Sequence, residues 1–203
     1  MLIRVFIYLP NNIQIFTDTI DNPKYQDIFK KVDVDFTKYH KRQSIVGNCL
    51  LADYMNISIE ELINGDFFNY GKHGKPYLKS NDFYFNISNS YNLVILVISD
   101  ENIGVDIEKI RPFSYRRITR AFNDSELKHL SSLPKEDEGN ETLKLWTIKE
   151  AILKLLGTGL SGKAKSVNIE TEFKASADRL GQQFKLTNID LESDYLGTLA
   201  TFK

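Results

Sequence analysis

The run Leu93–Ile98 (LVILVI) restricts the fold more than any other segment, because it contains no polar residue. Successive side chains of a strand point to opposite faces, so such a strand must be covered on both sides. The segment FYFNIS (83–88) before it is also typical of a strand, and the polar turn NSYN (89–92) separates the two. We therefore expect two neighbouring strands inside a layered core.

Helical and strand patterns follow one another twice along the 203 residues, a length that suits one large domain or two small ones. Apolar residues at helical spacing predict a helix from about 38 to 55, and Pro23 begins a shorter one over 23–32. The other predictions are strands at 2–9, 104–110, 166–173, 184–189 and 196–202, a short helix over 126–130 capped by Asp124 or Ser125, solvated loops at 69–78 and 134–141, and a helix from about 145 to Gly157.

A similar pattern occurs near the end of each half. FNISNSYNLVILVI (85–98) and KLTNIDLESDYLGTLATF (185–202) both give a strand, a polar turn, a Tyr and a second strand. An internal duplication and a chance likeness explain this pattern equally well.

Composition and charge exclude several classes of protein. The net charge of −1 gives no overall attraction to nucleic acid or membranes, and no run reaches the ~20 apolar residues of a membrane span. The N-terminus lacks the features of a signal peptide, so we expect a cytoplasmic protein. Cys49, the single cysteine, is expected to be buried and inert. The segment GTGLSGKA (157–164) follows a helix and ends in Ala, which argues against a P-loop.

The segment GVDIE (104–108) places two carboxylates on one face of a strand. Asp106 and Glu108 point one way while Val105 and Ile107 point the other way, into the expected core. Two neighbouring carboxylates repel each other unless a cation or proton lies between them, and oxygen ligands suit Mg²⁺. The alternative is an exposed edge strand whose acids face water.

The segment LWTIKEAILKLLGTGL (145–160) predicts an amphipathic helix. Its apolar stripe comprises Ile148, Ala151, Ile152, Leu155 and Leu156. Glu150 and Lys154 lie four residues apart on another face, where they could form a site or only a surface ion pair.

Together these segments resemble the 4′-phosphopantetheinyl transferases. That family has a G-[IV]-D-[IV]-E strand followed by a W-[ST]-x-K-E-[AS]-x-x-K helix, which match IGVDIE (103–108) and WTIKEAILKLLGTGL (146–160). The segments GKP (74–76), FNIS (85–88) and RAFNDSE (120–126) extend the likeness. The chain length is similar to that of the two-lobed, monomeric surfactin-type branch.

The resemblance implies an α+β fold with two similar lobes related by a pseudo-two-fold axis. We expect an N-terminal lobe at 1–100 that contacts the coenzyme A nucleotide, and a C-terminal lobe at 101–203 with the metal site and catalytic helix. The implied activity transfers the phosphopantetheine arm of coenzyme A to a serine of an apo acyl or peptidyl carrier protein, releasing 3′,5′-ADP. It requires Mg²⁺, or Mn²⁺ in its place.

The resemblance also assigns roles to residues. Asp106, Glu108 and Glu150 would hold the metal, Glu150 would act as base, Lys154 would contact the phosphate, and Glu126 would complete the acidic group or organise water. Arg42, Ser44, Lys75, Ser88, Asn89 and Lys154 would contact coenzyme A, with solvated surface charge as the alternative for Arg42 and Lys75. Asn89 stands where the family has His, and cannot carry its charge.

Two alternatives to an active transferase remain open. The chain could be an inactive coenzyme A-binding module, or an α+β interaction protein without a ligand. Phe113 and Phe122 are candidates for a carrier contact, although packing into the core explains each of them as well.

Overall fold

The computed structural model describes residues 3–9, 12–31, 39–159, 163–170, 175–191 and 194–203. The chain divides into two compact units. Unit 1 comprises Met1–Asn69 and Tyr77–Asp100, and unit 2 comprises Tyr70–Pro76 and Glu101–Lys203. The short segment Tyr70–Pro76 thus belongs with unit 2, although unit 1 precedes and follows it in the sequence.

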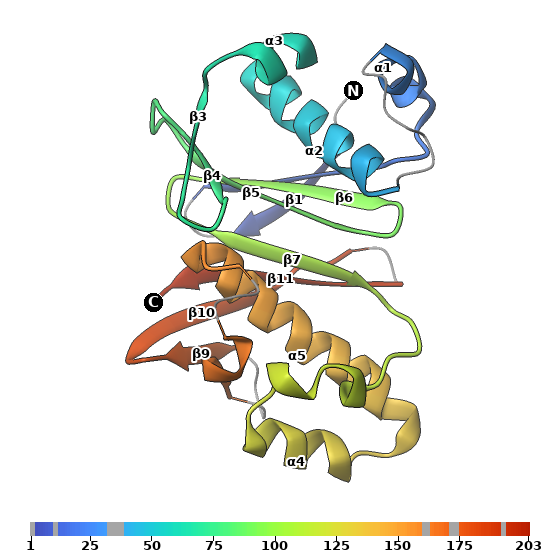
Figure 1. Cartoon of the computed structure of the whole chain (residues 1–203), viewed down its shortest axis with the longest axis vertical. Helices are drawn as coiled ribbons and strands as arrows, with labels where there is room; N and C mark the ends of the chain where they lie inside the picture. Colours follow the sequence, from blue (N-terminus) through green and yellow to red (C-terminus); the bar gives the residue numbers. More distant parts are fainter. Residues whose placement is uncertain (1–2, 10–11, 32–38, 160–162, 171–174, 192–193) are drawn as a thin grey trace. The chain divides into compact units, whose positions relative to one another are not determined.

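Unit 1 is a four-stranded antiparallel sheet with helices packed against it (Figure 1). The strand order is β1-β2-β6-β5. The strands are β1 (Ile3–Leu9), β2 (Ile13–Thr19), β5 (Tyr84–Ser90) and β6 (Leu93–Ser99), and the helices are η1 (Pro23–Tyr25), α1 (Gln26–Lys31), α2 (Tyr39–Met55) and α3 (Ile59–Asn64).

The core of unit 1 forms around β6 and α2. All seven residues of β6 are buried, which confirms the prediction for the apolar run. A Cβ on Gly47 would lie 2.9 Å from a methyl group of Ile87, so this glycine of α2 lets the helix lie close to the sheet. Burial raises the pKa of the Cys49 thiol to about 12, as expected of an inert core cysteine.

Unit 2 contains a five-stranded antiparallel sheet in the order β7-β11-β10-β9-β8. Its strands are β7 (Gly104–Lys109), β8 (Asn168–Ile169), β9 (Ser176–Arg179), β10 (Gln182–Asn188) and β11 (Tyr195–Phe202). The helices are η2 (Tyr115–Arg117), η3 (Thr119–Ala121), α4 (Asp124–Ser132), α5 (Lys135–Leu156) and η5 (Ala164–Ser166). Helix α5 packs against β7 and β11. The short strands β3 (Phe68–Tyr70) and β4 (Pro76–Leu78) pair with each other.

The two units share a topology. In unit 1 the chain runs from β2 through α2 to the β5–β6 hairpin, and β6 returns to pair antiparallel with β2. In unit 2 it runs from β7 through α5 to β10 and β11, and β11 returns to pair antiparallel with β7. This common path supports the internal duplication and agrees with the predicted fold of two α+β regions.

Several local predictions were wrong. The expected loop at 134–141 forms the first turns of α5, because Pro134 starts the helix and the acids Glu136, Asp137 and Glu138 complement its positive N-terminal end. Asn123, one residue before the predicted candidates, caps α4. Strands β2 and β9 and helix α3 were not predicted. The expected loop at 69–78 contains parts of β3 and β4, and Leu78 in it is buried.

Some predictions cannot be compared, because residues 2, 32, 38, 160–162 and 171–173 lie outside the described residues. Among the described residues, no helix combines the length and the hydropathy that crossing a bilayer requires.

Candidate active site

Gly104 allows strand β7 to lie directly against helix α5. A Cβ at this position would lie 2.0 Å from the Ala151 carbonyl oxygen and 2.4 Å from the Leu155 nitrogen. No side chain fits at such distances, so only glycine permits this approach of strand and helix. The close approach brings Asp106, two residues further along β7, within reach of the polar face of α5.

Asp106 and Lys154 form an ion pair between these two elements. The Lys154 Nζ donates to Asp106 Oδ1 over 2.8 Å, and the Asp106 side chain is buried. The sequence suggested a pair between Lys154 and Glu150 on the same helix, but the described ion pair of Lys154 reaches across to the strand. The pair is partly shielded from solvent, and an ion pair that is shielded from water is stronger than one at the exposed surface.

Glu150 is half-buried beside these charges. Its Oε1 is buried and accepts no hydrogen bond within the described structure. Burial and then the negative charges of Asp106 and Glu108 raise the pKa of Glu150 to about 7, against the opposing effect of Lys154. A carboxyl with a pKa near neutrality is suited to accept a proton at physiological pH.

Glu108 pairs with a different cation from Asp106, an arginine of the segment that follows β7. Arg111 Nη1 donates to Glu108 Oε2 over 2.7 Å and to the Lys109 carbonyl over 3.0 Å. In the part of the chain that the structure describes, no three acidic, His or Cys side chains are grouped to hold a metal ion. The charges of Asp106 and Glu108 nevertheless both act on Glu150, and the predicted metal role of these three acids remains a prediction.

Glu126 lies in a different environment from the one predicted. Its Oε2 binds the Lys149 ammonium over 2.8 Å, and both side chains are fully buried. The same oxygen accepts from the Asn123 backbone and completes a capping box at the start of α4. The described contacts of Glu126 thus tie helices together. Its predicted place in the acidic group remains a prediction.

Lys75 also has partners that the sequence did not suggest. Its ammonium donates to Asn102 Oδ1 over 2.7 Å and to the carbonyls of Ile103 and Leu155 over 3.1 Å each. An ammonium group has three donors, and these oxygens use all of them. Burial lowers the pKa of Lys75 to about 8. Lys75, expected in the N-terminal lobe, therefore lies in unit 2 at the C-terminal end of α5, rather than as solvated surface charge.

The other predicted coenzyme A contacts lie in unit 1. Arg42 and Ser44 are on α2, where the Arg42 guanidinium lies 5.9 Å from the centre of the Phe29 ring. Ser88 and Asn89 are neighbours on β5 and point to opposite faces, so Ser88 is buried and Asn89 is exposed.

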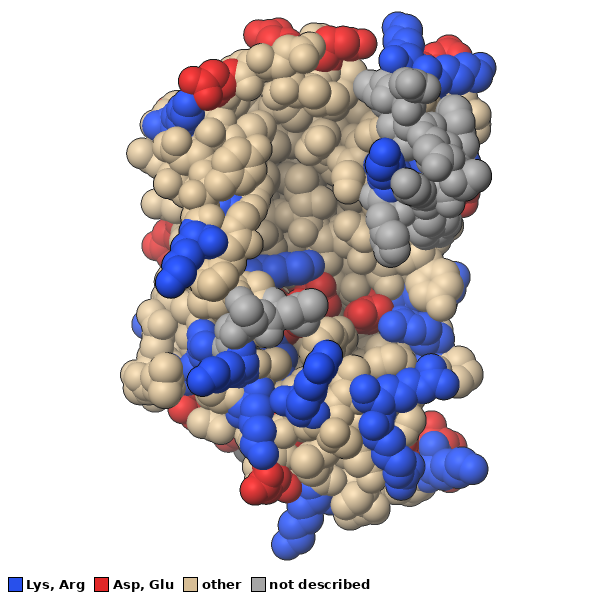
Figure 2. All heavy atoms as spheres, in the orientation of Figure 1, with Lys and Arg blue, Asp and Glu red and all other residues tan. Residues whose placement is uncertain are grey.

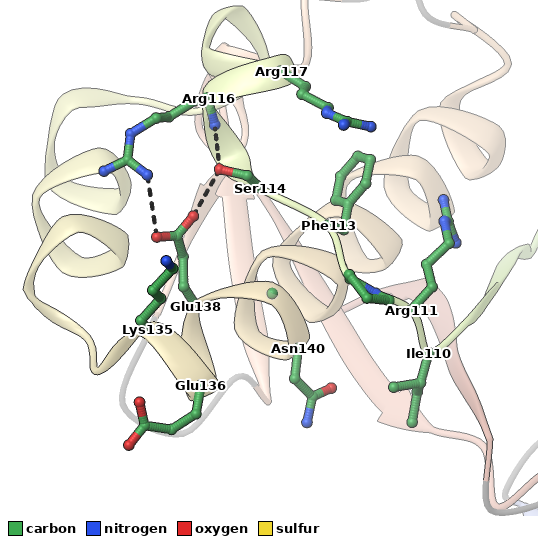
Figure 3. Close-up of a pocket in the computed structure, with 12 residues that line it drawn as sticks. Ile110, Arg111, Phe113, Ser114, Arg116, Arg117, Lys135, Glu136, Glu138 and Asn140 are labelled. Carbon is green, nitrogen blue, oxygen red and sulfur yellow. Dashed lines mark hydrogen bonds and ion pairs between the residues drawn. The ribbon is translucent and has the colours of Figure 1, made fainter.

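A pocket of about 670 Å³ lies at the start of α5 in unit 2. The segment Ile110–Arg117 after β7 and residues 135–140 of α5 form its walls. Figure 3 shows Arg116 and Ser114 directed at Glu138, while Arg111 and Phe113 extend into another part of the pocket. Figure 2 shows Lys and Arg side chains gathered over the part of unit 2 that contains α4 and α5. Phe113 lines this pocket, whereas Phe122 is fully buried in the core and cannot meet a partner.

The sequence did not predict Arg111 and Lys149 as members of the site. Arg111 follows Glu108 by three residues, a spacing that could have indicated their pairing. The partner of Lys149 is 23 residues earlier in the chain, so only the tertiary structure reveals it.

The arrangement provides a carboxyl of raised pKa, a second carboxylate and an ammonium group on two rigid elements. Such a set can accept a proton and neutralise negative charge on a phosphate, and phosphoryl transfer needs little more from a protein than positioning and charge.

The comparisons with known proteins agree with this chemistry. Residues 102–199 match the family model described as ACPS, 4′-phosphopantetheinyl transferase superfamily. The chain is 28% identical to the 4′-phosphopantetheinyl transferase gsp of Aneurinibacillus migulanus over 79% of its length and 68% of that protein. It is 31% identical to Sfp of Bacillus subtilis strain 168 (61% of this chain, 57% of that protein) and 31% identical to psf-1 of Bacillus pumilus (59% and 52%).

Over residues 102–199 the chain thus matches the 4′-phosphopantetheinyl transferase superfamily, and it is similar to relatives of the surfactin type. The matched parts cover between about half and two thirds of these relatives' own lengths.

Proposed function

We propose that this protein transfers the 4′-phosphopantetheine arm of coenzyme A to a serine of an apo acyl or peptidyl carrier protein. The observation that carries this proposal is the group formed by Asp106, Lys154 and the half-buried Glu150, within the segment that matches the family. The serine oxygen bonds to the phosphorus next to the pantetheine, the bond from that phosphorus to the bridging oxygen of the pyrophosphate breaks, and 3′,5′-ADP leaves.

In this reaction Glu150 accepts the proton of the serine hydroxyl. Its raised pKa supports that role, because a carboxylate of ordinary pKa is a weak base for a hydroxyl proton. Lys154 offsets the negative charge that accumulates on the phosphates as the bond breaks. Asp106 holds the Lys154 ammonium in place through their 2.8 Å contact.

Asp106 and Glu150 also fit a Mg²⁺ ion. The buried Glu150 Oε1 without a hydrogen bond is the kind of atom that a cation satisfies. Mg²⁺ in phosphate-handling enzymes usually takes one or two carboxylates and completes its shell with waters and substrate phosphates, so a third acid is not required. The ion would supply neutralisation of the pyrophosphate charge. Glu108 would have to share its carboxylate between the ion and Arg111, which holds Oε2, or leave Arg111.

Coenzyme A would reach exposed or partly exposed groups of unit 1, namely Arg42, Ser44 and Asn89. Ser88 is buried, and the three donors of Lys75 are engaged by protein oxygens, so these two residues would act by shaping the fold around the nucleotide. Asn89 can donate a hydrogen bond to a phosphate but adds no charge.

The carrier protein would dock at the pocket beside the start of α5. The pocket offers an aromatic side chain, Phe113, among the cations Arg111, Arg116, Arg117 and Lys135, with Glu136 and Glu138 as the opposing charges. This excess of positive charge complements an acidic partner.

The test is incubation of the protein with coenzyme A, Mg²⁺ and a panel of apo carrier proteins, followed by intact mass spectrometry of the carrier. We expect the carrier to gain the mass of one phosphopantetheine arm. Glu150→Gln and Asp106→Ala should each reduce turnover by at least ~100-fold, the scale for losing a positioned acid–base group.

Two other outcomes would be informative. Near-normal turnover in either variant would exclude the role assigned to that residue. Binding of coenzyme A in calorimetry without modification of any carrier would indicate the alternative, a coenzyme A-binding module without activity.

A further inference from the structure

The buried ammonium of Lys149 lies at the junction of three segments of unit 2. It donates to Glu126 Oε2 over 2.8 Å, to the Ala164 carbonyl over 3.0 Å and to the Val167 carbonyl over 2.6 Å. These acceptors come from the start of α4 and from the turn around η5, while Lys149 itself is on α5. All three donors of the ammonium group are therefore used inside the core.

A charge in this place has a considerable cost unless it is paired. Burial lowers the pKa of Lys149, and the charge of Glu126 opposes that effect. The Phe122 ring lies 5.9 Å from the ammonium on the same core face. Glu126 is itself fixed, because the Asn123 backbone donates to the same oxygen that Lys149 binds. The pair is thus held at both ends, by the capping box and by the two carbonyls.

Helix geometry connects this pair to the active site. Successive residues of an α-helix are about 100° apart around its axis. A Lys149 side chain fixed in the core therefore sets the rotation of α5 and directs Glu150 toward Asp106 on β7. Glu150 and Lys154, one turn apart, change direction together if the helix rotates.

We propose that Lys149 and Glu126 act as a positioning pair that sets the rotation of α5, so that Glu126 serves the reaction through Lys149 rather than by touching the substrate. The inference rests on the proposed function for what α5 does, but the pair itself is defined by contacts that do not depend on it. An apolar pair of similar length should hold the helix nearly as well, because a buried ion pair can often be replaced by hydrophobic residues.

The experiment compares four variants of the full chain: Lys149→Met, Glu126→Gln, the double variant Glu126→Leu/Lys149→Met, and Lys165→Met as control. Lys165 of η5 binds Asp124 of α4 over 2.9 Å, so it joins two of the three segments that meet at Lys149, but at the exposed surface and without involving α5. Urea unfolding gives the folded fraction of each variant. The kcat is calculated per molecule of folded protein, and the KM for coenzyme A is measured in the same assay. Deuterium uptake of residues 145–156 reports on α5 without any activity.

We expect each buried single variant to lower kcat by about tenfold or more, because displacement of a reacting group by about 1 Å can cost up to 10²-fold. The KM for coenzyme A should change less than kcat, since Lys154 is the one proposed contact with coenzyme A that lies on α5. Uptake over 145–156 should rise in both single variants. The double variant should recover most of kcat and of the protection, and Lys165→Met should behave as wild type.

Other results would overturn the proposal. A double variant as inactive as Glu126→Gln, with protection of α5 restored, would make Glu126 a catalytic group. Unchanged kcat per folded molecule in both single variants would leave the pair a purely structural one. Unchanged deuterium uptake in the single variants would refute the positioning role, even if the wild-type protein transferred nothing. If the uptake changes as expected but no transfer is detected, only the proposed function is refuted.

Discussion

Three acidic side chains of unit 2 each bind a different cation, and the three ion pairs differ in how deeply they are buried. Asp106 binds Lys154, Glu108 binds Arg111, and Glu126 binds Lys149. The first pair is partly buried at the candidate active site, the second borders the pocket, and the third is enclosed in the core. Glu150, whose buried Oε1 accepts no hydrogen bond among the described residues, has the raised pKa.

Replacing Arg111 should strengthen binding of a divalent ion. In Arg111→Met the carboxylate of Glu108 loses its cation and becomes able to join Asp106 and Glu150. We expect the affinity for Mn²⁺, measured by calorimetry in the presence of coenzyme A, to rise by roughly two- to fivefold, the scale of one partly exposed ion pair.

The matched control is Arg117→Met, which removes the same charge from the same pocket without a described contact to Glu108. An equal rise in both variants would mean that net charge alone is responsible, and that the Arg111–Glu108 contact has no special effect.

Lys75 should make the stability of the protein depend on pH in the alkaline range. Its pKa falls from 10.5 to about 8 on folding, so the unfolded chain binds more protons between these values. The stabilisation that depends on Lys75 is therefore complete above the pKa of the unfolded chain, 10.5. It is lost as the pH falls through the pKa of the folded protein, about 8.

This effect can be measured by urea unfolding of wild type and Lys75→Met at about pH 7 and about pH 10, where the wild type should gain relative to the variant at the higher pH. Lys72→Met, at an exposed position of the same turn, should show no such change. A difference between wild type and Lys75→Met that is the same at both pH values would refute the assignment.

At the scale of elements, the contact between β7 and α5 decides whether the site forms. Strand β7 carries Asp106 and Glu108, and helix α5 carries Glu150 and Lys154. Neither element contains a complete set of groups. Their close approach depends on Gly104, because the backbone of α5 occupies the space that a side chain at this position would need.

Gly104→Ala should therefore destabilise unit 2 and impair the site together. We expect a loss of about 2 kcal/mol or more in the free energy of unfolding, in the range for overpacked cores. Urea unfolding and the transfer assay measure the two effects. The control is Gly71→Ala, where the added Cβ would meet only the Lys75 carbonyl at an ordinary 3.6 Å. Wild-type stability of Gly104→Ala would contradict the packing described above.

At the scale of the whole molecule, the distribution of charge matters more than its sum. The net charge is only −1, yet the pocket beside α5 has an excess of Arg and Lys. A chain without a global field can still attract an acidic partner to one face. The two units share a helix-and-hairpin topology, and unit 2 adds this basic pocket to it.

Salt should accordingly weaken carrier recognition. Between about 0.05 M and about 0.5 M NaCl, where exposed charges become screened, we expect the KM for the carrier to rise severalfold. The double variant Arg117→Met/Lys135→Met should start with a higher KM and respond less to salt. Lys185→Met, at an exposed position of β10 outside the pocket, is the control and should respond as wild type does. A salt response that is the same in all three proteins would place the docking surface elsewhere.

The sequence by itself determined the elements whose pattern is local. The apolar run of β6, the alternation of GVDIE and the stripe of α5 each follow from the spacing of a few residues, because burial imposes a period of two or 3.6. The ends of elements were less well predicted. Polar residues 135–141 belong to α5 because tertiary packing and the helix dipole outweigh their loop-like composition.

Only the tertiary structure decided which cation each acid meets. Glu126 and Lys149 are 23 residues apart, Asp106 and Lys154 are 48 apart, and no periodicity relates them. Ion pairs of this kind form because strands and helices distant in sequence exclude water from the same place, where an unpaired charge would be costly. The sequence contained the chemical groups, and the packing of α5 against β7 and α4 determined their partners.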